Sequence, residues 1–127
     1  MSVSDQRYSF PSHHISSLTR EPHTFVRLKP PEKQFSLVYD SRALGAQSGP
    51  GVPRIFSVND EGQTGVEYHN NGRLLVVCRK AVHPKGGCGT VIDHGKAQWA
   101  VLFPIDRMRE AEAIVGEARA QLNAYRV

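Results

Sequence analysis

The chain has 127 residues, of which 39% are hydrophobic and 22% are charged, so it is long enough for one domain with a buried core. Sixteen lysines and arginines against twelve aspartates and glutamates give a formal net charge of +4, which favours an acidic partner. The longest apolar runs, at 74–78 and 99–103, are five residues each and far short of the roughly 18 residues of a membrane span. The beginning of the chain lacks the apolar stretch of a secretory signal, so we expect a cytoplasmic protein with no membrane partner.

Residues 1–22 are predicted to form a flexible N-terminal arm. Six serines occur among the first seventeen positions, and apolar residues are sparse. Low hydrophobicity at a chain end favours a segment that is mobile or that orders on a partner. The single folded domain is therefore expected at 23–127.

Alternating apolar and polar residues predict two strands before a long loop. The pattern that starts at His23 stops at Pro30-Pro31, and residues 34–40 carry their large apolar side chains at every second position. Residues 41–54 hold three glycines and two prolines, the composition of a loop. A short strand is expected at 55–58.

The dipeptide Asn71-Gly72 is a strong signal for a two-residue hairpin turn. It lies between the strand-like stretches 64–69 and 73–80. A turn formed by these two residues would pair Tyr68 with Leu75.

A second, weaker turn signal is His94-Gly95, between 90–93 and 96–103. This turn would pair Ile92 with Ala97 and place His94 at the tip of the hairpin. Together these stretches indicate an antiparallel sheet of about five to six strands.

The last segment is predicted to be an amphipathic helix with Asp106 as its N-cap. Apolar residues recur at steps of three and four, which is one helical face: Met108, Ala111, Ile114, Val115, Ala118, Leu122 and Tyr125. Packing this face on the sheet gives an α+β fold and favours a monomer, and a dimer through the C-terminal helix is the alternative.

The positive charge is concentrated between residues 69 and 96, where five cations face one aspartate. Clustered cations at hairpin ends can hold phosphates or carboxylates, so we predict a polyanion-binding surface formed by Arg73, Arg79, Lys80, Lys85 and Lys96. The alternative is that these cations only solvate hairpin ends and edge strands.

The same window contains two cysteines and two histidines that could bind zinc, namely Cys78, His83, Cys88 and His94. No pair has the close spacing that usually opens a zinc knuckle, and Cys78 lies in an apolar strand typical of a core thiol. We therefore predict no metal and no cofactor, with both cysteines as thiols unless they bind metal.

The glycine-rich loop at 84–90 has two further interpretations. Its backbone could cradle a phosphate, although it lacks the order of a P-loop. Alternatively, Cys88 could be a nucleophile with a nearby histidine as base. A plain flexible turn between strands is the third interpretation and the one we favour.

Most aromatic residues fit apolar strand faces, whereas Tyr8, Phe10 and Tyr125 are expected to be exposed. A sheet that stacks bases needs several exposed rings beside cations, and these three are distant from the basic window in sequence.

Three function classes remain. The one we favour is a non-enzymatic binding protein that engages a polyanion, either nucleic acid or an acidic surface of a nucleic-acid-handling complex. The second is a small interaction or inhibitor protein of the kind that mobile elements encode, acting by binding alone. The third is a cysteine-dependent or zinc-dependent enzyme.

Overall fold

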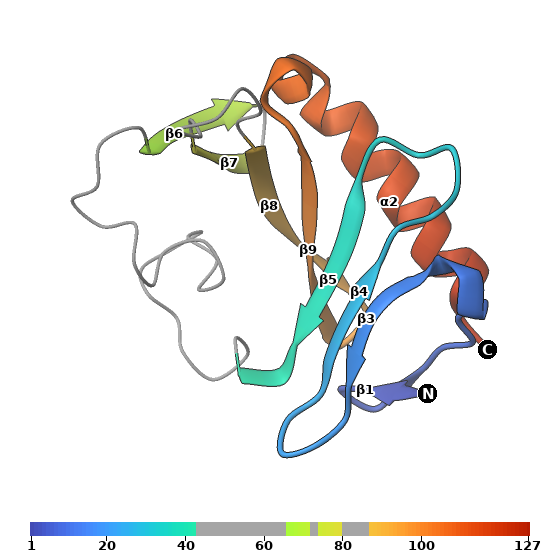
Figure 1. Ribbon diagram of the computed structural model, residues 1–127. Coiled ribbons are helices and arrows are strands. Elements are labelled where there is room, and N and C mark those ends of the chain that lie inside the picture. Colours follow the sequence, from blue (N-terminus) through green and yellow to red (C-terminus); the bar gives the residue numbers. More distant parts are fainter. Residues whose placement is uncertain (43–65, 72–73, 80–86) are drawn as a thin grey trace.

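An antiparallel sheet is the frame of the computed structural model, which describes residues 1–42, 66–71, 74–79 and 87–127 (Figure 1). Within these residues the main sheet has seven strands, one more than the upper end of the expected range. In spatial order they are β3 (Ile15–Thr19), β4 (Phe25–Leu28), β5 (Ser36–Asp40), β9 (Ala97–Pro104), β8 (Gly87–His94), β7 (Leu74–Arg79) and β6 (Val66–Asn71). The predicted α+β class, with an antiparallel sheet and a C-terminal helix, is confirmed.

Buried and more exposed side chains alternate along parts of β8 and β9 because one face of each strand is buried against the helix. Cross-strand partners share a face, and Ile92 pairs with Trp99 while Thr90 pairs with Val101. All four side chains are buried. The same face continues across the sheet through β5, where Leu37 is fully buried and pairs with Val101.

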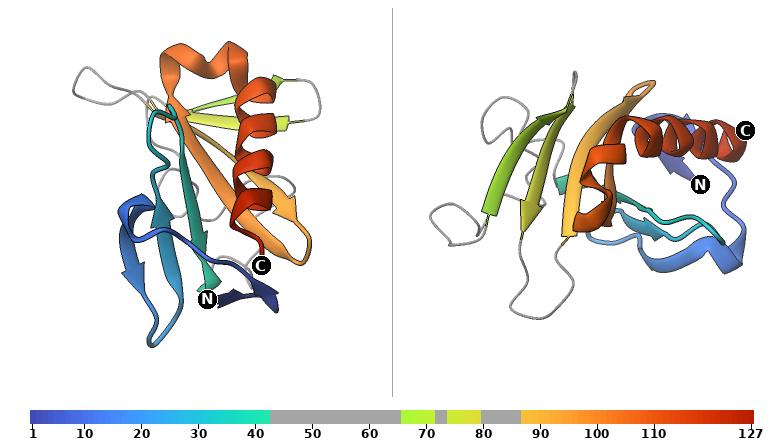
Figure 2. Two further views of the ribbon diagram at one scale, coloured as in Figure 1. Left: turned by 90° about the vertical axis from the view of Figure 1, so that its right-hand side faces the viewer. Right: turned by 90° about the horizontal axis from the view of Figure 1, so that it is seen from above.

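Helix α2 (Ala111–Tyr125) crosses this face, as two of the views show (Figures 1 and 2). Its buried residues reproduce the predicted apolar face apart from Met108, so the surface that could have paired with a second copy is covered by the chain's own sheet. The predicted start is wrong: residues Ile105–Glu110 form a 3-10 helix (η3), and Glu110, not Asp106, is the N-cap of α2.

Both predicted hairpin registers are wrong by two residues. In the β6–β7 pair Tyr68 lies opposite Val77, and in the β8–β9 pair Ile92 lies opposite Trp99. The second turn is therefore formed by Gly95 and Lys96, with the positive φ of 61° at Gly95 that a tight hairpin turn requires at its first central residue. A shift of two preserves which face each residue occupies, so the apolar pattern alone did not distinguish the two registers.

The expectation of a flexible arm at 1–22 is contradicted by burial. Val3 is 2% exposed and Tyr8 is fully buried, both inside the main core. Strands β1 (Ser2–Val3) and β2 (Gln6–Arg7) form a small ribbon through a two-residue turn with positive φ at Ser4 and Asp5. After a 3-10 turn, η1 (Ser12–His14), strand β3 pairs with β4 across the expected domain boundary.

Two expected elements, the strand at 55–58 and most of the loop at 41–54, lie outside the described residues. The second face of the sheet is nevertheless apolar at its centre, where Val38, Val77 and Ala100 are buried. This agrees with the apolar character of both sides of the 74–78 stretch.

Deleting residues 1–10 should destabilise the domain. Each large apolar side chain removed from a core costs about 1.5–3 kcal/mol, so the loss of Val3 and Tyr8 should lower the free energy of unfolding by at least about 3 kcal/mol in urea titrations. Replacing the exposed Ser9 by alanine is the control and should change it by less than about 0.5 kcal/mol. An unchanged midpoint of urea unfolding after the deletion would instead support a flexible N-terminal arm.

Candidate binding groove and the predicted site residues

The two cysteines form a disulfide, so the expectation of thiols or metal ligands is wrong. Cys78 and Cys88 are direct partners on β7 and β8, both at most 2% exposed, and a disulfide joins them. Because both sulfurs are bonded to each other, Cys88 cannot act as a nucleophile and neither sulfur is a thiolate for zinc. The pairing was not visible in the sequence because it depends on the register of β7 against β8.

The other zinc candidates do not join the cysteines. His94 ends β8, six residues beyond Cys88, and both of its ring nitrogens are hydrogen-bonded. His83 lies outside the described residues, among which no group of three or more metal-ligating side chains occurs.

Four of the seven residues of the glycine-rich loop at 84–90 are strand. Residues 87–90 belong to β8 and pair with β9, and the hydroxyl of buried Thr90 donates to the carbonyl of Leu75 at 2.9 Å. Because the backbone of residues 87–90 pairs with β9 in the sheet, it is not a phosphate-binding loop. Residues 84–86 are not described.

The predicted polyanion residues do not form one compact patch where they are described. Arg79 pairs with Gly87 at the start of β8, whereas Lys96 follows the end of that strand. At about 3.3 Å per residue the length of β8 separates them by roughly 23 Å. Arg73, Lys80 and Lys85 lie outside the described residues, and Lys96 is exposed in the hairpin turn.

A buried polar network lies at the Lys96 end of the hairpin. The hydroxyl of Tyr8 lies 2.8 Å from Nδ1 of His94, and Nε2 of His94 lies 2.7 Å from Oδ1 of Asn123. Nε1 of Trp99 donates to the same hydroxyl at 3.4 Å. Nε2 of His94 can donate to Oδ1 of Asn123 while Nδ1 accepts from the hydroxyl of Tyr8. Burial raises the pKa of Tyr8, which keeps its hydroxyl protonated and able to donate.

The three aromatic residues expected at the surface pack together instead. Tyr8 stacks on Phe10 at 5.4 Å between ring centroids, and Phe10 meets Tyr125 edge-on at 5.2 Å. Trp99 contacts both Tyr8 and Phe10. Backbone bonds reinforce this packing, since Ser9 donates from its N–H to the carbonyl of Tyr125 at 2.7 Å. The rings therefore hold the N-terminal segment against the helix and the sheet.

A groove of about 480 Å³ lies where this segment approaches strand β3. Its apolar lining includes half-buried Phe10 and Ile15 and the 39%-exposed Leu18. Two arginines, Arg7 and Arg20, also line it. Both chain ends and the β8–β9 turn lie at the same end of the molecule (Figures 1 and 2).

Four exposed cations border this region, and we call them the basic end: Arg7, Arg20, Lys96 and Arg126. Lys96 is tied to the N-terminal ribbon because its N–H donates to Oε1 of Gln6 at 2.7 Å, and Arg126 is the bridge partner of Tyr8. None of the four forms an ion pair with another described residue. The basic end is therefore open to an anion.

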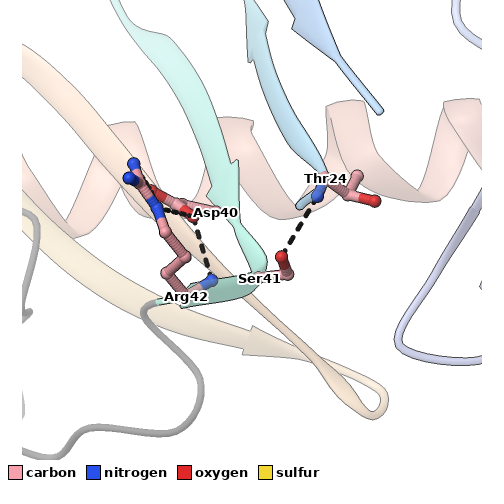
Figure 3. Close-up of polar contacts among 4 residues, drawn as sticks. All are labelled: Thr24, Asp40, Ser41 and Arg42. Carbon is pink, nitrogen blue, oxygen red and sulfur yellow. Dashed lines mark hydrogen bonds and ion pairs between the residues drawn. The ribbon is translucent and has the colours of Figure 1, made fainter. Parts of the chain in front are cut away.

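Another cation, Arg42, is neutralised at the end of β5 (Figure 3). Its guanidinium lies 2.8 Å from Oδ2 of Asp40, and its backbone N–H donates to Oδ1 at 2.9 Å. Burial alone would raise the pKa of Asp40, but the hydrogen bonds and charge of Arg42 outweigh it and the pKa is lowered. The hydroxyl of Ser41 accepts from the N–H of Thr24 and fastens β5 to β4.

No protein-family model matches this chain, no curated protein matches its sequence, and no solved structure matches its fold. Among the described residues, no helix has both the length and the apolar character needed to cross a bilayer.

Sequence reasoning missed the two groove arginines because they lie in the stretch interpreted as an arm. One signal was present: the aromatic Tyr8 and Phe10 alternate with the polar Arg7 and Ser9, which is the period of a half-buried extended segment.

Removing the disulfide should destabilise the fold. Closing a loop of about ten residues restricts the unfolded chain by roughly 3 kcal/mol, so Cys78→Ala/Cys88→Ala should unfold with that much less free energy in urea. In parallel, the wild-type chain is unfolded in denaturant without a reductant and treated with iodoacetamide. No cysteine should then be alkylated, because both are in the disulfide. Two alkylated cysteines per wild-type chain would contradict the pairing.

Acid should remove the stabilisation contributed by Asp40. Because the pKa of Asp40 is lowered in the folded state, that contribution is complete above the ordinary aspartate pKa of 3.8 and is lost as the pH falls through the lower folded pKa. The stability difference between wild type and Asp40→Asn should thus be constant from pH 7 to 5 and shrink below about 4. Asp106→Asn, at an exposed position, is the control. A stability difference between wild type and Asp40→Asn that grows towards low pH would contradict a lowered pKa of Asp40.

Proposed function

We propose that this chain is a non-enzymatic binding protein whose basic end engages a polyanionic partner, either nucleic acid or an acidic protein surface. The observation that carries the proposal is the set of four exposed cations without ion-pair partners among the described residues. Clustered unpaired cations attract a polyanion through charge and through release of its counterions. Lys96 belongs to this set and to the surface expected from the sequence.

Binding is favoured over catalysis by the state of the cysteines. The enzyme alternative depended on Cys88 as a nucleophile or on zinc, and the disulfide removes the thiol that either would use. The disulfide also favours an oxidising compartment over the cytoplasm that was expected from the sequence. The contributions of Arg73, Arg79, Lys80 and Lys85 to the same function stay predictions.

The test is fluorescence anisotropy with three labelled probes: a 20-nucleotide single-stranded DNA, an RNA of the same sequence, and poly-glutamate. Affinity for at least one probe should fall linearly on a log–log plot against NaCl concentration, and Lys96→Ala/Arg126→Ala should reduce that slope by between about one and two.

A matched control removes the same charge at the other end of the β8–β9 hairpin. Arg107→Ala/Arg109→Ala should leave the slope unchanged, since these residues follow Pro104, which pairs with Gly87. Equal loss in both variants would mean that the basic end has no special role, and absence of binding to all three probes at 50 mM NaCl would overturn the proposal.

A further inference from the structure

Strand β3 presents an unpaired edge beside the groove. It is the first strand of the sheet and pairs only with β4 within the described residues. In an antiparallel pair alternate residues direct their N–H and C=O groups away from the partner, so β3 offers free backbone groups to a further strand.

Apart from a bulge at its start, the edge also lacks the usual protection against pairing. Edge strands are commonly blocked by lysine, inward-pointing charge or proline, whereas β3 reads Ile-Ser-Ser-Leu-Thr. Its last four residues are exposed, and Leu18 is one of only two large hydrophobic residues exposed in the described chain. A bulge lies at its start, between Ile15 and Ser17, and leaves 17–19 as the regular stretch.

The groove and its charges indicate what would pair there. Ile15 and Leu18 of β3 line it together with Phe10, so an apolar side chain of an added strand would contact them. Arg7 and Arg20 line the same groove without an ion pair among the described residues. Carboxylates that flank the apolar side chain would complement both arginines.

We infer that the groove is a strand-addition site for an extended, acidic segment of another protein, with an apolar anchor in the groove and backbone hydrogen bonds to β3. This rests on the proposed function and commits it to a protein partner. Single-stranded nucleic acid fits less well, because base stacking needs free aromatic faces. The one aromatic side chain that is not fully buried here, Phe10, is stacked on Tyr8 and meets Trp99 and Tyr125 edge-on.

The probe is a fluorescein-labelled eight-residue peptide that alternates glutamate with valine and leucine, titrated at 50 mM NaCl. Arg7→Ala/Arg20→Ala should weaken its binding by about tenfold, the equivalent of 1.4 kcal/mol. Leu18→Ala should weaken it severalfold, and Arg107→Ala/Arg109→Ala, at the other end of the β8–β9 hairpin, is the control that should change it by less than about twofold. Far-UV circular dichroism verifies that each variant is folded.

Backbone pairing is tested separately by N-methylation of the peptide. Methylating one alternate set of residues should abolish binding, whereas methylating the other set should leave it within a few fold, because only one set faces β3. Equal effects of the two sets, or wild-type affinity in Arg7→Ala/Arg20→Ala, would overturn the inference.

The two proposals fail in different ways. Binding of DNA, RNA or poly-glutamate without binding of the peptide would overturn strand addition and leave the basic end as a polyanion site. If Arg7→Ala/Arg20→Ala weakens oligonucleotide binding while the peptide does not bind, the groove takes nucleic acid instead. Absence of binding to every probe would overturn both proposals.

Discussion

The hydrogen bond between Tyr8 and His94 joins the three parts of the molecule that build its basic end. Tyr8 belongs to the N-terminal segment, His94 ends β8, and Asn123, the second partner of His94, lies in the last turns of α2. Both Tyr8 and His94 are buried, and a buried donor or acceptor left without a partner costs about 1–3 kcal/mol. Undocking of the N-terminal segment would therefore leave the buried imidazole of His94 without its Tyr8 partner.

Docking of the N-terminal segment creates the groove. The residues around Tyr8 form one side of it, and β3 forms the other. The same docking places Gln6, the residue before Arg7, against the β8–β9 turn, where its side chain accepts from the N–H of Lys96 and occupies the space that a Cβ at Gly95 would need. The cations of the basic end thus owe their common location to a network in which none of them takes part.

The fold class was predictable from the sequence because the spacing of apolar residues indicates which faces of an element are buried. The helical face from Ala111 to Tyr125 reflects one covered side, whereas the apolar residues on both sides of β5 and β9 reflect a sheet centre that is buried on both faces. The hairpin registers were not predictable, since a shift of two residues leaves every side chain on its face. The N-terminal ribbon was missed because its turn, Ser4-Asp5, adopts positive φ at both positions without glycine or asparagine.

The candidate site was predictable only in part, for a related reason. Lys96 was identified from local charge density, which is visible along the chain. Arg7 and Arg20 become neighbours only because the N-terminal segment and β3 pack side by side, and the Cys78–Cys88 bond depends on the pairing of β7 with β8. Contacts of this kind come from tertiary packing, which no local pattern reports.

The most direct test of this account is a double-mutant cycle on the network around His94. The free energies of unfolding of wild type, Tyr8→Phe, Asn123→Ala and the double variant would be measured in urea. Because both side chains bond to the same imidazole, their effects should be coupled by about 1 kcal/mol or more. Additive effects within about 0.3 kcal/mol would show that Tyr8 and Asn123 act independently, and would contradict a single network as the link between these segments.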